Sequence, residues 1–197
     1  MVNLASFEQL SDDYKQRRLD LQKNDNTCGL ASIRNSLSFS FNCDIPETEL
    51  WEPAQKIYDD LGSKRKILQD GIGPRAMAKL IKAIGRERLN REFKIFMTSH
   101  GEVGQLEYFL ERNIAPIIHR PFWEGDQDGH YETVIGMDNS HVYLFNSARE
   151  TVTSGIHRKT LEEFDKKWWL FDNEKLLLAY YPAGIVLPRE KFRRRRG

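Results

Sequence analysis

The hydrophobic spacing of this chain changes along its length, and that change limits the folds it can adopt. Up to residue 85, apolar side chains recur every three or four positions, which is typical of amphipathic helices. From residue 93 onward, most apolar runs are short and rich in β-branched and aromatic side chains, which is typical of strands. Helices followed by strands in one chain of 197 residues predict an α+β fold, with a helical N-terminal half packed on an antiparallel sheet from the C-terminal half.

Three segments of the N-terminal half carry the helical spacing. The first follows Asn26 and Thr27, either of which can cap a helix with its side chain. The second covers residues 46–62 and ends at a glycine. The third covers residues 74–85, with Pro74 in the first turn, where proline is well tolerated. Each segment has one apolar face, so we expect all three to pack against a common core.

The C-terminal half predicts a sheet with two interspersed helices. Pro116 interrupts one strand-like run, which predicts that this strand lies at a sheet edge or starts at the proline. A short turn near residues 139 and 140 predicts that the strands on either side of it form a hairpin. The last strand is expected to close the sheet. The expected strands are 93–99, 114–120, 130–138, 141–147 and 175–182, and the expected helices are 103–113 and 160–169.

Composition places the chain among globular proteins, since 40% of its residues are hydrophobic, 30% are charged and the mean hydropathy is −0.62. No apolar run approaches the roughly 20 residues of a spanning helix, and the N-terminus lacks the layout of a secretory signal. We therefore expect a cytoplasmic protein with no membrane partner. The expected organisation is one domain over residues 1–186 and a basic, disordered tail over residues 187–197. This tail is the only hint of a nucleic-acid partner, and a short basic terminus is more often a solvated end.

Two cysteines, Cys28 and Cys43, are too few for a disulfide framework and lack the paired spacing of a zinc site. Cys28 falls in the first turn of the first expected helix. Backbone N–H groups and the helix dipole at that position stabilise a thiolate, which is the attacking form of cysteine. Gly29, directly after it, leaves space for a substrate carbonyl to approach the backbone. A lone cysteine at a helix start is more often a small buried hydrophobe, so Cys28 becomes a candidate nucleophile only together with a base.

Histidine is the usual base for such a thiol, because its pKa lies near neutrality. Of the five histidines, His130 opens an expected strand directly after the polar stretch 124–129, a position from which a side chain can face a cleft. The alternative is a histidine on a surface loop. A metal site built on His119, His130 and His141 lacks an HExxH motif or a close Cys/His pair, so we expect no metal and no cofactor.

Two further side chains complete the expected site. Asn146 ends the strand that pairs with the one opened by His130, so both would lie at the open end of the hairpin, where Asn146 can orient the imidazole. The alternative for Asn146 is a cap on the following turn. Gln22, in the loop before the cysteine, can donate a neutral amide to an oxyanion. Asn24 and Asn26 are possible substitutes for that donor.

Substrate contacts are expected from residues on either side of the nucleophile and the base. Trp123 and Gly129 belong to the glycine-containing loop before His130, and we expect both to bind substrate together with Gly29. This loop is also a candidate lid. Trp168, by contrast, is expected to anchor the core under the sheet.

Taken in order, the runs 22–29 and 130–136 and the residue Asn146 resemble the bacteriocin-leader peptidases, the papain-like family thirty-nine of the cysteine peptidases. Founding members of that family process leaders that end in double glycine. The spacing agrees: a glutamine stands six residues before the cysteine, a histidine opens a strand about a hundred residues later, and an amide or acidic residue follows sixteen beyond that histidine. The likeness spans roughly residues 18–182.

This resemblance implies a papain-like fold, with Cys28 as nucleophile, His130 as base, Asn146 as its orienter and Gln22 in the oxyanion hole. The sequence departs from the family at two places. The family often has Asp where this chain has Thr27, and it often has Asp-Pro where this chain has Asn146 followed by Ser147. Asparagine is acceptable as the third residue of papain-like sites. Founding members are fused to an ATP-driven exporter, which these residues do not include, so the resemblance does not predict export of a bacteriocin.

These residues support three kinds of function. In a thiol peptidase or amidase, Cys28 attacks a carbonyl, His130 protonates the leaving amine, and water releases the acyl-enzyme. In an acyltransferase, such as the transglutaminase-like or phytochelatin-synthase-like enzymes, an amine or thiol replaces water. The third kind is a noncatalytic binding module, which the joint retention of four site residues disfavours. We expect the first kind, acting on a peptide or protein, and leave the oligomeric state open.

Overall fold

The computed structural model describes residues 19, 21–121, 129–148, 155–168, 175–188 and 192. Its helical half contains α2 (Cys28–Phe41), the 3-10 helix η1 (Glu47–Leu50), α3 (Trp51–Asp60), α4 (Ile67–Asp70) and α5 (Pro74–Arg88). The second half contains β1 (Phe93–Thr98), α6 (Val103–Leu110), β2 (Ile117–Arg120), β3 (His130–Met137), β4 (His141–Asn146), β5 (Gly155–Thr160), α7 (Leu161–Lys167) and β6 (Leu176–Pro182). The expected order of helices and then strands is confirmed.

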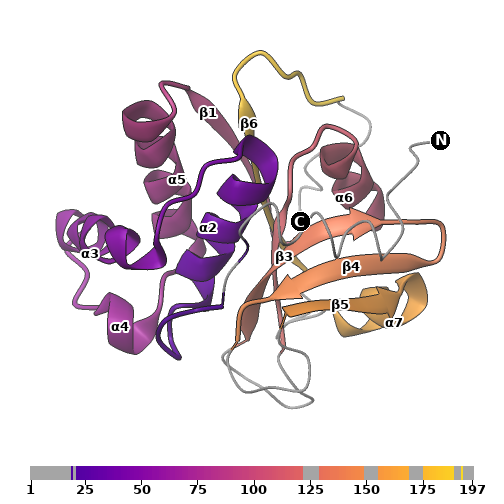
Figure 1. Cartoon of the computed structure of the whole chain (residues 1–197), viewed down its shortest axis with the longest axis horizontal. Coiled ribbons are helices and arrows are strands. Elements are labelled where there is room, and N and C mark those ends of the chain that lie inside the picture. Colours follow the sequence, from indigo (N-terminus) through magenta and orange to yellow (C-terminus); the bar gives the residue numbers. More distant parts are fainter. Residues whose placement is uncertain are drawn as a thin grey trace.

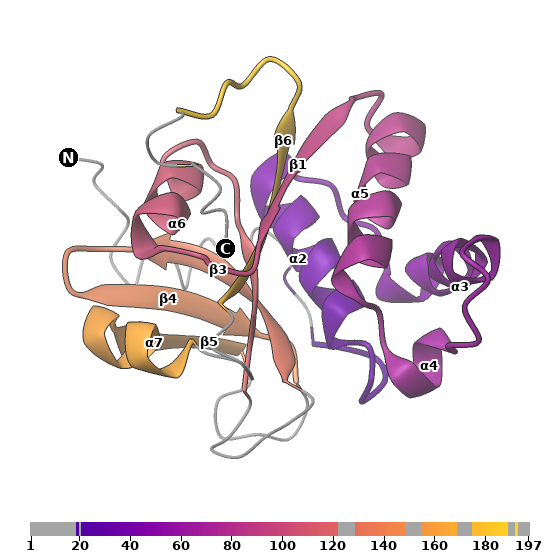
Figure 2. The same ribbon diagram turned by 180° about the vertical axis from the view of Figure 1, so that it is seen from behind.

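The described strands form one six-stranded sheet in the order β1-β6-β2-β3-β4-β5, in which every neighbouring pair is antiparallel. The helices α2 and α5 lie to one side of this sheet, and α6 and α7 lie to the other (Figure 1; seen from behind in Figure 2). The result is the expected α+β architecture, with the helical half packed on an antiparallel sheet.

Strand β2 begins directly after Pro116, which is one of the two predicted alternatives, and it does not lie at an edge of the sheet. The sheet orders β2 between β6 and β3, because the proline lies just before the ladder and removes no hydrogen bond from it. The last strand, β6, likewise lies inside the sheet instead of closing it. The edges are β1 and β5, and β5 and α4 were not predicted, since the segments that form them are short and largely polar.

Two apolar cores occupy the two faces of the sheet. On one face, side chains of α2 and α5 pack against Tyr131, Leu178 and Tyr180 of the strands. On the other face, α6 and α7 pack against strand residues such as Val134 and contact the fully buried Trp168, which confirms that this tryptophan anchors the core. The first core fixes α2, and therefore its N-terminal end, against the strand that His130 opens.

None of the helices in the described part of the chain combines the length and the apolar composition that crossing a bilayer requires.

Candidate active site

Cys28 is the first residue of α2, as the sequence predicts. Thr27 holds the N-cap position, but no side chain caps the helix. The Thr27 hydroxyl instead donates to the carbonyl of Asn24 at 2.7 Å and accepts from the Asn24 N–H at 3.1 Å. The expected side-chain cap is therefore wrong, because the hydroxyl closes the preceding loop on itself.

The surroundings of the Cys28 sulfur favour the protonated thiol. Burial raises the pKa of this thiol, and the carboxylate of Glu47 raises it further. Hydrogen bonds from the backbone of Tyr131, Gly29 and Cys28 itself lower the pKa, but burial outweighs them. A nucleophilic role for Cys28 therefore requires a base that removes the proton.

Strands β3 and β4 bring His130 and Asn146 together, as predicted. His130 Nε2 lies 2.9 Å from Asn146 Oδ1. The backbone N–H of Ala148 donates to the same atom at 2.8 Å, which identifies it as the amide oxygen and makes His130 Nε2 the donor. In the neutral ring, Nδ1 then carries the lone pair that can take a proton.

A β-bulge decides on which face of the hairpin Asn146 lies. The register shifts by one residue between Val134 and Gly136. Toward the open end of the hairpin, the next pair in this register is Asn146 and Glu132. Glu132 lies two residues after His130 on β3, so both side chains lie on the same face of the sheet. Without the shift, the side chain of Asn146 would lie on the opposite face of the sheet. The bulge is therefore a condition for the contact between Asn146 and His130.

Cys28 and His130 line the same cavity, which has a volume of about 560 Å³. The cavity lies where the N-terminal end of α2 meets the segment before α5 and the neighbouring ends of β2 and β3. Its other lining residues are Asp25, Asn26, Arg65, Gln69, Asp70, Gly71, Ile72, Gly73, Pro74, His119, Gly129 and Tyr131. The fold thus brings the candidate nucleophile and the candidate base, 102 positions apart, to one concave site.

Gln22 is buried beside this cavity and does not line it. Its side-chain Nε2 donates to the carbonyl of Asp25 at 2.9 Å, and its Oε1 accepts from the hydroxyl of Ser147 at 3.4 Å. Its backbone N–H also donates to the carbonyl of Ser147 at 2.8 Å. Gln22 therefore ties the loop before the cysteine to the residue after Asn146, and its role in an oxyanion hole stays a prediction. Of the two possible substitutes, Asn26 lines the cavity.

The three expected substrate contacts have different outcomes. Gly129 lines the cavity with a φ of 69°, a backbone conformation that favours glycine. Gly29 is buried and does not line the cavity; a Cβ there would lie 2.6 Å from Cγ2 of Ile72, so close packing explains this glycine. Substrate contact by Gly29 stays a prediction. Trp123 lies outside the described residues.

Of the two other histidines of the expected set, one lies near His130 and one lies at the far end of the hairpin. His119 stacks on Tyr131, with ring centroids 4.2 Å apart, and lines the cavity. His141 lies at the other end of the hairpin, where its Nδ1 is 2.9 Å from the hydroxyl of Ser140. Within the described ranges, no group of three His, Cys, Asp or Glu side chains is placed to hold a metal ion.

A buried ion pair supports the strand that carries His130, and the sequence did not predict it. Arg120 donates from Nε and a terminal nitrogen to the two carboxylate oxygens of Glu132, at 2.6 and 2.7 Å. Glu132 is fully buried, and Arg120 is the register partner of His130 on β2. Burial raises the pKa of the Glu132 carboxyl, but the charge and hydrogen bonds of Arg120 outweigh burial and hold the pKa below its ordinary value. The available signal was Glu132 itself, because it is the one acidic residue of β3.

Breaking this ion pair is expected to destabilise the protein strongly. Arg120→Met leaves the carboxylate of Glu132 buried without its partner, which typically costs about 3–5 kcal/mol. Arg88→Met removes an exposed arginine that pairs with Glu49 at 3.1 Å and should cost at most about 1 kcal/mol. Urea unfolding of the wild type and both variants measures this difference, and equal losses would contradict the assignment.

His157 on β5 is half-buried beside the same ion pair. Neither of its ring nitrogens has a hydrogen-bond partner in the described part of the chain, and Nε2 lies 3.8 Å from Oε1 of Glu132. Burial lowers the pKa of His157; Glu132 opposes this effect, while Arg120 and Lys159 add to it. The unfolded chain therefore takes up a proton at His157 at a higher pH than the folded protein does.

The free energy of unfolding is accordingly expected to fall as the pH is lowered from about 7 to 5, because the pKa of a histidine in the unfolded chain is about 6.5. Glu132 adds to the fall only at lower pH, because the pKa of its carboxyl is held below the ordinary value of 4.5. His157→Leu should flatten the dependence of the unfolding free energy on pH in this window, which urea unfolding of the wild type and this variant at several pH values measures. An unchanged slope in His157→Leu would show that this histidine is not the titrating group.

Neither a protein-family model nor a curated protein matches this sequence. Solved structures do resemble the fold. The peptidase domain of Streptococcus ComA, a bi-functional ABC transporter, aligns with 84% of this chain and 96% of that domain, at 16% identity and a TM-score of 0.56. A protein from Bacillus anthracis described as a C39-like peptidase aligns with 84% of this chain and 95% of its own, at 13% identity and a TM-score of 0.56.

The peptidase domain of Streptococcus mutans ComA gives a similar result, with 84% of this chain and 99% of that domain aligned at 14% identity and a TM-score of 0.50. The likeness therefore covers nearly the whole length of each of these domains, although few residues are identical. It matches the resemblance that the order of cysteine, histidine and asparagine suggests. The chain has the papain-like α+β fold of the C39-like peptidase domains.

Proposed function

We propose that this protein is a thiol peptidase or amidase in which Cys28 is the nucleophile and His130 its base. The observation that carries the proposal is the bond of 2.9 Å between His130 Nε2 and Asn146 Oδ1, at a histidine that shares a cavity with Cys28. A histidine held through one nitrogen has its other nitrogen directed for proton transfer, which is the arrangement of nucleophile, base and orienter in cysteine hydrolases. The fold likeness to C39-like peptidase domains agrees with this reading.

The proposed reaction has two steps. In the first, His130 Nδ1 takes the proton of the Cys28 thiol as the sulfur attacks the carbonyl carbon of the substrate. The tetrahedral intermediate collapses, the bond to the leaving nitrogen breaks, and His130 returns the proton to that amine. In the second step, His130 takes a proton from water, the water oxygen attacks the thioester carbon, and Cys28 leaves as a thiolate that is protonated again. The products are an amine and a carboxylic acid.

The developing oxyanion needs hydrogen-bond donors near the sulfur. The backbone N–H groups of Cys28 and Gly29, which lower the pKa of the thiol, are the proposed backbone donors. Gln22 is the proposed side-chain donor. Its Nε2 donates to the carbonyl of Asp25 at 2.9 Å, which holds the amide in the loop before the cysteine. The raised pKa of the Cys28 thiol fits a general-base mechanism, because the neutral thiol is the form present before the base acts.

The test is turnover of a peptide library in H₂¹⁸O, followed by mass spectrometry. A hydrolase forms products whose new carboxyl group carries one ¹⁸O atom, because water is the acceptor of the acyl group. An acyltransferase, given glycine ethyl ester as an added amine, forms amide products without the label. A binding module forms no product. Labelled products that disappear in Cys28→Ala support the proposal, and either other outcome overturns it.

A further inference from the structure

The cavity at Cys28 continues into a second one along the start of α5. The second cavity has a volume of about 550 Å³, and the two share Arg65, Gly73 and Pro74 as lining residues. A ligand that occupies one can therefore extend into the other without leaving the surface. A polypeptide substrate needs such a path, because residues next to its scissile bond must also be held.

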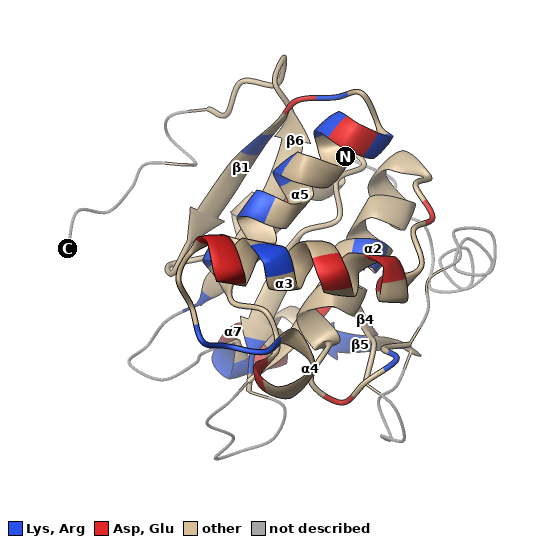
Figure 3. Ribbon diagram, turned by 90° about the vertical axis from the view of Figure 1, so that its left-hand side faces the viewer, with Lys and Arg blue, Asp and Glu red and all other residues tan. Residues whose placement is uncertain are grey.

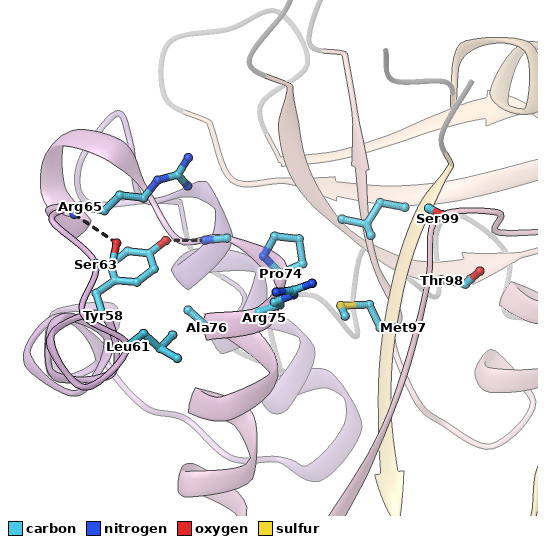
Figure 4. Close-up of a pocket in the computed structure, with 12 residues that line it drawn as sticks. Tyr58, Leu61, Ser63, Arg65, Pro74, Arg75, Ala76, Met97, Thr98 and Ser99 are labelled. Atoms are coloured by element: carbon cyan, nitrogen blue, oxygen red, sulfur yellow. Dashed lines mark hydrogen bonds between the residues drawn. The ribbon is translucent and has the colours of Figure 1, made fainter. Parts of the chain in front are cut away.

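The second cavity has apolar side chains on opposite walls. Figure 4 shows Leu61 beside Tyr58 on the wall next to α3, and Met97 at the end of β1 on the opposite wall, with Pro74 between them. Leu61 is 47% exposed and Met97 is 38% exposed, which makes them two of four large apolar side chains that the described residues leave open to solvent. Exposed apolar side chains that face each other across a cavity favour an apolar ligand group between them.

A line of basic side chains continues from this cavity along α5. We call it the α5 stripe, and it consists of Arg75, Lys79, Lys82 and Arg86, all exposed. At about 100° per residue these positions fall within roughly 60° of one another around the helix, and they extend over about 17 Å. Arg75 also lines the second cavity, so the stripe begins there. Figure 3 shows the basic positions along α5, and beside it α3, which carries charges of both signs.

No described residue forms an ion pair or hydrogen bond with the four side chains of the α5 stripe. Arg88, at the end of the same helix, does pair with a carboxylate, that of Glu49. The guanidinium of Arg65, between the two cavities, likewise has no such partner among the described residues. A row of like charges without counter-ions produces a positive field that favours an anionic ligand.

The sign of the charge changes toward the nucleophile. Asp25 and Asp70 line only the cavity at Cys28, Arg75 lines only the second cavity, and Arg65 lines both. An acidic side chain directly beside the scissile bond would meet these two carboxylates. The same side chain further along the groove would meet the α5 stripe. The charges thus favour acidic residues at a distance from the bond that is cut.

Building on the function proposed above, we infer that the substrate is a polypeptide with an acidic segment that binds along the α5 stripe. An apolar side chain of this polypeptide occupies the space between Leu61 and Met97, and the bond to be cut lies at Cys28. The stripe of about 17 Å matches about five residues of extended chain at 3.3 Å each. A polypeptide fits better than a nucleic acid, because the basic line leads into an apolar cavity and then to a thiol suited to acyl transfer.

The test is equilibrium binding to the full-length Cys28→Ala chain, measured by fluorescence anisotropy at low ionic strength. The probe is a labelled ten-residue peptide with five consecutive glutamates, one leucine and neutral polar residues, synthesised with the glutamates before or after the leucine. Control probes carry glutamine for glutamate or serine for leucine, and a ten-nucleotide single-stranded DNA serves as the competing polyanion. Lys79→Gln/Lys82→Gln removes two charges of the α5 stripe, and Lys166→Gln/Lys167→Gln removes two exposed charges of α7 as the matched control.

Of the two glutamate peptides, which have the glutamates before or after the leucine, one is expected to bind roughly tenfold more tightly than its glutamine and serine counterparts. Lys79→Gln/Lys82→Gln should weaken this binding by roughly three- to tenfold, and Lys166→Gln/Lys167→Gln by less than about twofold. Equal binding of the glutamate and glutamine peptides, equal losses in the two variants, or tighter binding of the DNA would overturn the inference. Because binding needs no catalysis, these outcomes are independent of whether the wild type turns over any peptide, which tests the proposed function.

Discussion

Cys28→Ala is expected to abolish turnover, with a loss of roughly 10⁴–10⁶-fold in kcat. The sulfur is the atom that forms the acyl-enzyme, and nothing else in the cavity can replace it as a nucleophile of the same strength. Because Cys28 is only partly exposed and contacts the core around α2, the measurement is paired with thermal unfolding, to show that the variant remains folded.

The matched control is Cys43→Ala. Cys43 is also partly exposed, and burial also raises the pKa of its thiol, but it does not line the cavity. Its loss should leave kcat within about twofold of the wild type, in the range of a surface substitution. Turnover that survives in Cys28→Ala, or that is lost equally in Cys43→Ala, would contradict the assignment of the nucleophile.

His130→Ala is expected to lower kcat by roughly 10²–10⁴-fold, because the variant has no base to deprotonate a thiol whose pKa is raised by burial. His100→Ala, which removes an exposed histidine outside the cavity, should have no effect on turnover. The measurement is steady-state turnover of a peptide found in the library screen. A His130→Ala variant with the activity of the wild type would rule out this histidine as the base.

Asn146 allows a graded test of the same hypothesis. Asn146→Asp keeps an oxygen that can accept from both His130 and Ala148, and it should retain most of the activity. Asn146→Ala removes this acceptor, so we expect a loss of up to about 10²-fold from misplacement of the imidazole. Rescue by the aspartate variant separates orientation of His130 from a merely structural role.

The sequence was sufficient for the parts of the site that depend on local pattern. The helical spacing after Thr27 predicts that α2 starts at Cys28, and the turn near Asn139 predicts that one hairpin carries His130 and Asn146. Both predictions use short-range information, namely the period of apolar residues and the length of a turn. The same short-range patterns also predict the order of helices and strands correctly along most of the chain.

Other parts depend on contacts between distant segments and could not be predicted. The bulge before Gly136 places Asn146 on the face of His130, and a glycine within a strand indicates such an irregularity without giving its direction. The pairing of Arg120 with Glu132 requires the register of β2 against β3. The interior position of β6 was missed because the sequence does not reveal where a returning strand inserts into a sheet.

The helical spacing of the α5 stripe is visible in the sequence, but its place beside the groove is visible only in the structure. Four basic residues on one helical face are usually a solvated surface. Their continuity with the groove, and the absence of acidic partners among the described residues, make the stripe a candidate for substrate recognition.

The central claim is that His130 activates Cys28, and the rate of alkylation of each cysteine by iodoacetamide near neutral pH tests it most directly. Burial raises the pKa of both thiols, so neither should react quickly without assistance from a base. We predict that Cys28 reacts much faster than Cys43 in the wild type, and that His130→Ala reduces the rate at Cys28 to that at Cys43 or below. Equal rates in the wild type, or a fast reaction of Cys28 that persists in His130→Ala, would contradict the account.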